Sequence, residues 1–457
     1  MKKGYHAACP SLAADSEGVL FMVPMIYNLF PTLVGPVDGW ITHAERARAM
    51  GFNWVYVNPF CYPGFSGSLY AIKEHDRLHP ALEPRSGERG IDALPDAVRA
   101  IRAMGLGVMI DLVVNHTAKD SPLVTRHPTW FRWASDGRLV SPRAVDPADT
   151  RKVVVWGDLA QVDNAGSPDR EALWRFWEGL VDRALDLGIT GFRGDAAYKV
   201  PAPLWRRLAA RAKAREPGAL FVAETLGCTP EEVAALGGVG FDYFYNSSKW
   251  WDLVAPWCLE QHERFRTVAP SIAFPESHDT PRLAAETGGS EAVQRQRYAL
   301  AALFSAGVQM TVGYEFGFQR PLDVVKTRPT DWEEPRFDLA PFLRRVNGLK
   351  ATHPLLRGEG VLRRLDWGGS AVTVLRRWSD ETGTHRGVLV VNRDLTVERE
   401  VTVDRSELPA GAQVLRPCRD GRPLAEGPVP DRLALAPAEV VLLAEGPGGP
   451  GGERRAS

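Results

Sequence analysis

Short apolar runs alternate with amphipathic segments from about residue 19 to residue 354. The runs are apolar at successive positions, which is typical of parallel strands buried on both faces. The segments between them carry apolar residues at helical spacing. The pattern predicts eight strands, at residues 20–29, 52–59, 107–115, 189–195, 219–224, 240–246, 270–276 and 308–314. It predicts helices at residues 40–50, 91–104, 171–187, 202–215, 230–236, 249–263, 290–306 and 338–350.

Eight strands that alternate with helices predict an α/β protein, a (β/α)8 TIM barrel rather than an open doubly wound sheet. No glycine-rich phosphate fingerprint follows the first strand, which also disfavours a dinucleotide-binding fold. Residues 117–168 break the alternation with Pro, Asp, Trp and Gly at no clear period. A structureless loop of that length is uncommon in a compact domain, so we expect an inserted subdomain after strand three. The barrel then comprises residues 19–116 and 169–354.

The chain ends are expected to differ from the barrel. Residues 355–445 hold β-branched runs separated by Gly, Pro and Asp, which predict a small C-terminal antiparallel β-sandwich. Its expected strands are residues 370–378, 386–392, 397–403 and 433–443. The Gly- and Pro-rich residues 446–457 are predicted to form a disordered tail. Residues 1–18 are predicted to form an N-terminal arm of low order.

Composition narrows the class of partners. The 55 basic and 56 acidic residues give a net charge of −1, which favours neither nucleic acid nor an anionic membrane as a partner. No apolar run approaches the roughly 20 residues of a membrane span, and the N-terminus has no clean signal-peptide core. The five cysteines are scattered without metal-ligand spacing, which favours free thiols over a disulfide framework. We therefore expect a soluble cytoplasmic protein. Its 14 Trp would also suit a cleft that stacks aromatic rings on sugars.

Polar side chains follow four of the predicted strands. In TIM-barrel enzymes, residues at the carboxyl ends of strands are candidates for catalysis. A single polar residue there is as easily an ordinary cap, but four polar strand ends together favour an active site. The four stretches are Asp111 to His116, Arg193 to Asp195, Glu224 with Thr225, and Glu276 to Asp279.

Three acids from these strand ends predict retaining glycosidic bond chemistry. Asp195 follows Arg193 by two positions, on the same face of the strand, and the guanidinium is expected to keep it ionised as a nucleophile. Glu224 follows an apolar strand, where burial and nearby negative charge are expected to raise its pKa, as suits a general acid/base. Asp279 with His278 is expected to bind sugar hydroxyls and favour a distorted ring.

Taken together, these residues resemble the four short motifs of the α-amylase superfamily, which contains retaining α-glycoside hydrolases and transglycosidases. The resemblance covers residues 20 to 445, with an inserted domain and a C-terminal β-sandwich. It implies Asp195 as nucleophile, Glu224 as acid/base and Asp279 as transition-state stabiliser. It also implies substrate-binding residues around the sugar next to the scissile bond, namely Tyr70, Asp111, His116, Arg193 and His278. Asp158 and Leu159 resemble the short motif that ends the family's inserted domain.

The sequence departs from the family after the nucleophile. Many α-amylases carry a Lys-His pair there, which contacts the next sugar and a calcium ion, whereas this chain reads Ala196-Ala197-Tyr198-Lys199. Asn115 alone does not make a calcium site, which needs about 6–8 oxygen ligands. We therefore expect no cofactor and leave calcium as a possibility without support. Lys199 is predicted to bind substrate, through a sugar hydroxyl or a phosphate; an exposed lysine without such a role is the competing interpretation.

Three functions remain open from the sequence. The first is hydrolysis or transfer at α-1,4-glucosidic bonds of an α-glucan or maltooligosaccharide, through a covalent intermediate on Asp195. The second is maltosyl transfer from a glycosyl phosphate donor, because residues 127–131 (HPTWF) resemble bacterial maltosyltransferases that use maltose 1-phosphate. The third is a non-catalytic carbohydrate-binding or scaffolding protein, although such a protein would often have lost one of the three acids.

Overall fold

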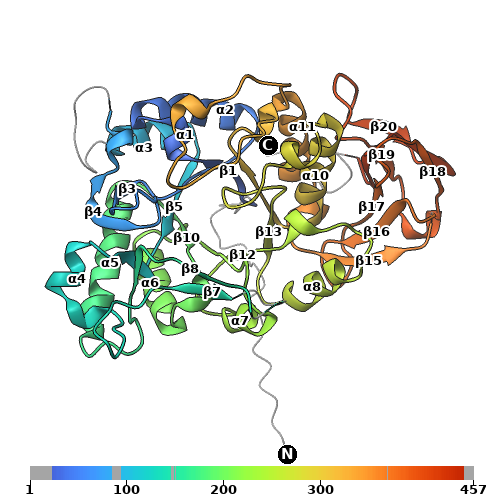
Figure 1. The fold of residues 1–457 in the computed structure, drawn as a ribbon. Coiled ribbons are helices and arrows are strands. Elements are labelled where there is room, and N and C mark those ends of the chain that lie inside the picture. Colours follow the sequence, from blue (N-terminus) through green and yellow to red (C-terminus); the bar gives the residue numbers. More distant parts are fainter. Residues whose placement is uncertain (1–22, 85–93, 146–148, 150, 368, 447–457) are drawn as a thin grey trace, which may run out of the picture.

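The computed structural model describes residues 23–84, 94–145, 149, 151–367 and 369–446. Its centre is a closed barrel of eight parallel strands in the order β1-β14-β13-β12-β11-β10-β5-β2 (Figure 1). The strands are β1 (Met25–Leu29), β2 (Trp54–Val57), β5 (Gly107–Leu112), β10 (Gly191–Gly194), β11 (Leu220–Ala223), β12 (Tyr243–Tyr245), β13 (Ser271–Ala273) and β14 (Gly307–Thr311). Each lies within one of the eight predicted segments or starts one residue before it, so the predicted TIM barrel is confirmed.

Helices surround the barrel. They are α1 (Pro31–Val34), α2 (Trp40–Ala49), α3 (Leu94–Ala103), α5 (Arg170–Asp186), α6 (Ala202–Arg215), α7 (Pro230–Ala235), α8 (Trp257–Phe265), α9 (Leu283–Glu286), α10 (Glu291–Phe304) and α11 (Ala340–Thr352). The prediction of one helix over residues 249–263 is wrong, because α8 begins only at Trp257. Asp252 accepts hydrogen bonds from the backbone N–H groups of Val254 and Ala255, which forms a turn instead of a helix. Among the described residues, none of the helices has the length and hydropathy required to cross a bilayer.

Glycines shape the barrel interior around Trp54. A Cβ on Gly191 would lie 2.7 Å from Met109 Cβ and 2.8 Å from the Trp54 ring, and a Cβ on Gly107 would lie 2.4 Å from that ring. Only glycine leaves room for the indole at these two strand starts. The packed interior fixes the strands in register, so that Arg193 of β10 lies beside Asp111 of β5.

The stretch after β5 forms two small antiparallel pairs. The strand β6 (His116–Ala118) pairs with β9 (Leu159–Gln161), and β7 (Arg143–Val145) pairs with β8 (Val153–Val155); α4 (Pro122–Arg126) lies between β6 and β7. The inserted subdomain predicted after strand three is thus present in the fold. Trp130 stacks on His127 with ring centroids 3.9 Å apart, and its Nε1 donates to Asp169 at 3.1 Å. These two members of the HPTWF stretch therefore fasten the insertion to the start of α5.

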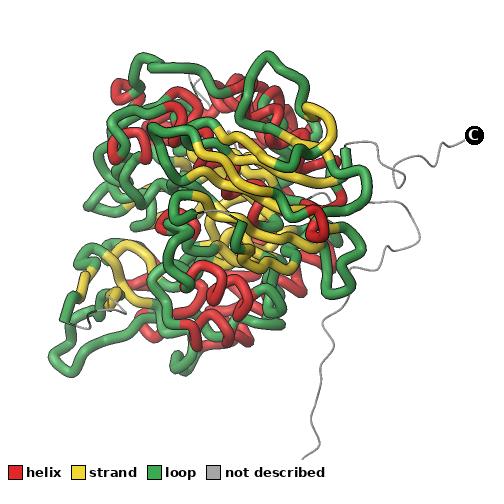
Figure 2. The backbone as a smooth tube through the Cα atoms, turned by 90° about the vertical axis from the view of Figure 1, so that its right-hand side faces the viewer, coloured by secondary structure: helices red, strands yellow, loops and turns green. Residues whose placement is uncertain are grey.

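The C-terminal region is antiparallel, as predicted. A six-stranded sheet has the order β15-β16-β17-β22-β19-β20, and β18 pairs with β21 in a second, two-stranded sheet. Figure 2 shows the molecule from the side of this region, with its strands in yellow toward the viewer. Its strands are β15 (Val361–Leu365), β16 (Val372–Trp378), β17 (Arg386–Asn392), β18 (Arg399–Thr402), β19 (Gln413–Leu415), β20 (Ala425–Pro428), β21 (Arg432–Leu435) and β22 (Val440–Ala444). The single strand predicted over 433–443 is wrong: Pro437 interrupts it, since proline cannot donate to a ladder.

Two predicted segments fall outside what the structure describes. The N-terminal arm (residues 1–18) lies entirely among the residues that are not described, and so does the tail (446–457) apart from Gly446. Both remain predictions.

Candidate active site

The ends of three neighbouring strands meet at one buried guanidinium. Arg193 Nη1 lies 3.3 Å from Asp195 Oδ1 and also contacts Asp111, while Nη2 lies 3.1 Å from Glu224 Oε2. The side chains of Arg193 and Asp111 are 5% and 0% exposed, and those of Asp195 and Glu224 are 10% and 16% exposed. The two carboxylates at the carboxyl ends of β10 and β11 are therefore fixed by different nitrogens of the same cation.

A sharp turn follows Asp195. Ala196 has a φ of 44°, in the left-handed region that residues with a Cβ seldom adopt, and such strain costs about 1–2 kcal/mol. The turn lets the Ala196 N–H donate to Glu224 Oε2 at 2.8 Å. Glu224 therefore has two fixed donors on one oxygen, the Ala196 amide and the Arg193 guanidinium, which leaves its second oxygen for the reacting bond.

Tyr70, His278 and Asp279 form a second connected group. The Tyr70 hydroxyl lies 2.7 Å from His278 Nε2 and donates to Asp111 Oδ2 at 3.2 Å, and the two rings are stacked with a 7° interplanar angle. His278 Nε2 lies 3.0 Å from Asp279 Oδ2. Through Asp111, this group joins the carboxylates around Arg193. The structure therefore brings seven of the nine predicted site residues into one network.

Sequence reasoning missed the layer beneath this network. Tyr56 donates to Asp111 Oδ2 at 2.7 Å, and the Asn58 amide donates to the hydroxyls of Tyr56 and Tyr70 at 3.1 Å each. Asn28 donates to Asn58 at 2.8 Å and is fully buried with it. The sequence did carry a signal for these polar residues, because Asn28 and Asn58 interrupt apolar runs near the carboxyl ends of their strands.

The expectation that Arg193 keeps Asp195 ionised is wrong. Burial, together with the Glu224 and Asp111 carboxylates, raises the pKa of Asp195 well above its usual range, despite the opposing charge of Arg193. The physical reason is the balance of charge, because one guanidinium is in contact with three buried carboxylates. Like charges this close disfavour one another's ionised form, which is why the pKa of Asp195 is raised.

Asp279 and His116 are in different electrostatic environments from Asp195. Partial desolvation by the surrounding protein opposes ionisation of Asp279, but the adjacent His278 and the charge of Arg193 bring its pKa below the usual value. Its side chain is 53% exposed, which places it at the opening of the site. Burial lowers the pKa of His116 to about 4, so the ring is neutral near pH 7. Its Nε2 has no hydrogen-bond partner among the described residues, which leaves it available to a sugar hydroxyl.

Lys199 lies apart from the acids. Its ammonium donates to the backbone oxygen of Arg143 in β7 at 2.9 Å and lies over the Tyr198 ring. It lines a cleft of about 1100 Å³ between the insertion and the loop after Asp195, together with Lys119 and Arg143. The predicted role of Lys199 in substrate binding stays a prediction.

Metal binding was not expected from the sequence. Within the described ranges, no group of three or more His, Cys, Asp and Glu side chains is arranged to hold a metal ion. The Asn115 amide, the one candidate ligand, lies 3.4 Å from His116 Nδ1. The expected absence of a metal or cofactor stays a prediction.

The chain resembles known proteins in sequence. A family profile for the glucanotransferase domain of glycogen debranching enzyme matches residues 24–131. The α-1,4-glucan:maltose-1-phosphate maltosyltransferase of Burkholderia pseudomallei is 28% identical over 434 residues, which cover 92% of this chain and 37% of that protein. The enzyme of the same name from Myxococcus xanthus is 27% identical over 355 residues, covering 71% and 51%. The chain thus spans about a third to a half of the length of these relatives.

Solved structures resemble the chain over nearly its whole length. An α-amylase from Lactobacillus plantarum superposes with a TM-score of 0.73 at 20% identity, covering 93% of this chain and 99% of that one. The chain has the α-amylase fold. The debranching enzyme from Nostoc punctiforme is also similar, with a TM-score of 0.67 at 18% identity, covering 92% and 98%. The predicted resemblance to the α-amylase superfamily is confirmed in the fold and in the similarity to relatives named for their action on α-glucans.

One acid at the strand ends of this α-amylase fold has a structural role. Glu276 accepts from Arg282 Nη1 and from the Leu283 N–H, both at 2.7 Å, and both charged side chains are 1% exposed. Removal of one partner leaves a buried charge without compensation. We expect Glu276→Ala to lower the free energy of unfolding by about 3–5 kcal/mol in urea denaturation. Asp120→Asn, at a half-exposed ion pair with Lys73, is the control and should change it by less than about 1 kcal/mol.

The raised pKa of Asp195 predicts the pH profile of the free enzyme. A nucleophile must be ionised, so kcat/KM should fall as the pH drops through the raised pKa, and its acid limb should lie above the ordinary aspartate range of about 3.9. Glu224→Gln removes the neighbouring charge and should move that limb to lower pH on a substrate that needs no protonation. An acid limb at the ordinary aspartate value in the unmodified enzyme would contradict the charge balance described above.

Proposed function

We propose that the protein is a retaining enzyme that cleaves or transfers α-1,4-linked glucosyl units of an α-glucan or maltooligosaccharide. The observation that carries the proposal is the Arg193 guanidinium, which holds Asp195 on one nitrogen and Glu224 on the other. Retaining mechanisms require two carboxyl groups about 5–5.5 Å apart, closer than inverting ones. Two carboxylates bound to one guanidinium agree with the shorter separation.

In the proposed reaction Glu224 is the proton donor and Asp195 is the nucleophile. Asp195 attacks the anomeric carbon while Glu224 gives its proton to the leaving oxygen, and a glycosyl ester forms on Asp195. Glu224 then takes a proton from water or from a sugar hydroxyl, which attacks the anomeric carbon and frees Asp195. Asp279 and His278 bind the ring hydroxyls, and Tyr70 stacks on the sugar. Positive charge that develops on the sugar stabilises the ionised form of Asp195, which burial and the neighbouring carboxylates disfavour.

The stereochemistry of the first product tests this proposal. We expect maltoheptaose to yield products whose new reducing end is the α-anomer when proton NMR spectra are recorded within the first minutes. The result follows from two successive inversions at the anomeric carbon. The β-anomer as first product would overturn the retaining mechanism, and an absence of turnover with binding retained would favour the non-catalytic alternative.

A second candidate is maltosyl transfer from a glycosyl phosphate. It is favoured by the similarity to named maltosyltransferases over 92% of the chain and by the cations that line the cleft beside the insertion. Maltoheptaose incubated with and without inorganic phosphate separates the two candidates. A phosphorylated sugar that forms only with phosphate supports the transferase, and its absence from a turning-over enzyme counts against it.

We also propose that the protein works in the cytoplasm. The support is that Cys61, Cys228, Cys258 and Cys418 are free thiols rather than disulfide partners. Fractionation of cells that express the tagged full chain tests this; recovery in the medium or in a membrane fraction would contradict it.

A further inference from the structure

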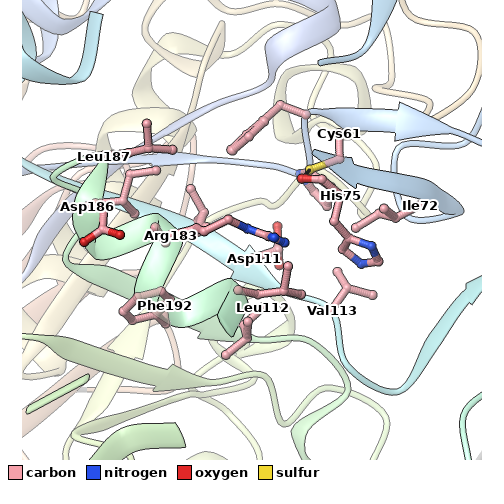
Figure 3. A pocket seen from close by; sticks show the side chains of 16 residues that line it. Cys61, Ile72, His75, Asp111, Leu112, Val113, Arg183, Asp186, Leu187 and Phe192 are labelled. Carbon is pink, nitrogen blue, oxygen red and sulfur yellow. Dashed lines mark hydrogen bonds between the residues drawn. The ribbon is translucent and has the colours of Figure 1, made fainter. Parts of the chain in front are cut away.

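A separate cavity of about 260 Å³ lies on the flank of the barrel (Figure 3). It is enclosed by the outer face of β5, by α5, and by the hairpin of β3 (Cys61–Pro63) and β4 (Ile72–Leu78). Asp111 belongs to the cavity wall only as part of strand β5. Its carboxylate is bound to Tyr56, Tyr70 and Arg193 on the opposite side of that strand. The barrel wall therefore separates this cavity from the carboxylates.

The cavity is mainly apolar. Ile110, Leu112 and Phe192 face it from the strands, and Leu180 and Ala184 face it from α5. A dry cavity of about 150 Å³ with such a lining binds benzene, so this larger space has room for an apolar ligand of about ten non-hydrogen atoms.

One cation in this wall has no partner among the described residues. Arg183 makes no side-chain hydrogen bond or ion pair to any of them, and it is exposed to solvent. In Figure 3 its side chain extends from α5 toward β5 and the hairpin. Asp186, an acid of the same helix that also lines the cavity, is paired with Arg215 at 2.5 Å. The cavity therefore combines an apolar interior with a guanidinium that forms no hydrogen bond or ion pair with a described side chain.

His75 adds a neutral polar group. Its Nε2 is buried and has no hydrogen-bond partner within the described part of the chain. Burial and the charge of Arg183 lower the pKa of His75 to about 4, so near pH 7 the ring is uncharged and carries one N–H. The thiol of Cys61 is close by, but burial raises its pKa to about 12, so it is protonated and a poor nucleophile. The site thus suits reversible rather than covalent binding.

We infer that this cavity is a binding site for a medium-chain aliphatic carboxylate, with the chain against Ile110 and Phe192 and the carboxylate on Arg183. A guanidinium matches a carboxylate with two parallel hydrogen bonds, and the His75 ring can supply a further donor. The available space corresponds to a chain of about eight carbons. The inference is independent of the glycosidic chemistry and does not require the enzyme to turn over.

Calorimetric titration of the full chain with octanoate and with octanamide, its neutral analogue, tests the charge. We expect saturable 1:1 binding of octanoate, and at least about tenfold weaker binding by Arg183→Met, the loss expected for a charged hydrogen bond. Octanamide affinity should change less than about threefold. Asp76→Asn removes an exposed acid of β4 whose charge also acts on His75, and it should bind octanoate at least as tightly.

A second variant tests where the aliphatic chain of the ligand binds. Ala184→Phe fills the cavity and should abolish binding of both ligands, while circular dichroism and activity on maltoheptaose report that the fold is intact. If Ala184→Phe fails to fold, Leu180→Phe takes its place. No saturable octanoate binding to the unmodified protein, or equal affinity in Arg183→Met, would overturn the inference.

Discussion

Replacement of Asp195 by Asn is expected to lower kcat on maltoheptaose by about 10⁴-fold or more, the scale of loss when a nucleophile is removed. Asn preserves the shape and the contact with Arg193, but its amide cannot attack the anomeric carbon. Reducing-sugar release measured at saturating substrate reports the loss. Asp136→Asn, an exposed pair with Arg138, is the matched control and should retain full activity.

The same variant should not lose stability. Asp195 shares one guanidinium with two further carboxylates, and its raised pKa means that ionisation costs free energy in the folded protein above the unfolded pKa. A neutral Asn removes that cost near pH 7. We therefore expect a Tm equal to or above that of the unmodified protein. Activity retained within about tenfold would contradict the role of Asp195, whereas a large fall in Tm would contradict the account of its electrostatics.

Replacement of Glu224 by Gln should have an effect that depends on the leaving group. General acid catalysis contributes about 10²–10⁴-fold, so kcat/KM on maltoheptaose should fall by that factor. On α-maltosyl fluoride the rate of the first step should fall by a far smaller factor, because fluoride departs without a proton. The comparison is made from fluoride release and from reducing-sugar release with the same enzyme preparation.

The contrast between the two substrates is the informative readout for Glu224. An equal loss on both would indicate that the Glu224→Gln substitution disturbs the Ala196 turn or the Arg193 contact rather than proton transfer. Asp96→Asn, at an exposed ion pair with Arg99 on α3, is the control and should leave both substrates unaffected.

The barrel could be predicted from the sequence because its strands are buried on both faces. Such strands read as continuous apolar runs, and helices with one apolar face lie between them. The secondary-structure prediction fails where turn-forming residues or exposed polar residues interrupt the apolar pattern. Residues 249–256 carry apolar residues, but Asp252 stabilises a turn and Pro256 precedes the helix. In the sheet, β15 and β20 were missed because each includes charged or Gly and Pro residues on an exposed face.

The site residues could be located but not their protonation. Asp111 and Arg193 lie near the carboxyl ends of β5 and β10, and Glu224 and His278 follow β11 and β13. Parallel strands bring these ends together. The number of carboxylates that share Arg193 depends on side-chain positions in space, and it reverses the expected shift of the Asp195 pKa. Lys199 was placed with the acids by its nearness to Asp195 in sequence, but the turn at Ala196 directs the chain toward the insertion.

Trapping of the glycosyl-enzyme tests the central claim most directly. The full chain is incubated with 5-fluoro-α-glucosyl fluoride, a slow substrate whose ester accumulates, then digested with pepsin and analysed by tandem mass spectrometry. We predict one fluoroglucosyl adduct, on the carboxyl group of Asp195, and none in Asp195→Asn. An adduct on Glu224 or Asp279, or complete turnover of a natural substrate with inversion and no adduct, would contradict a covalent mechanism on Asp195.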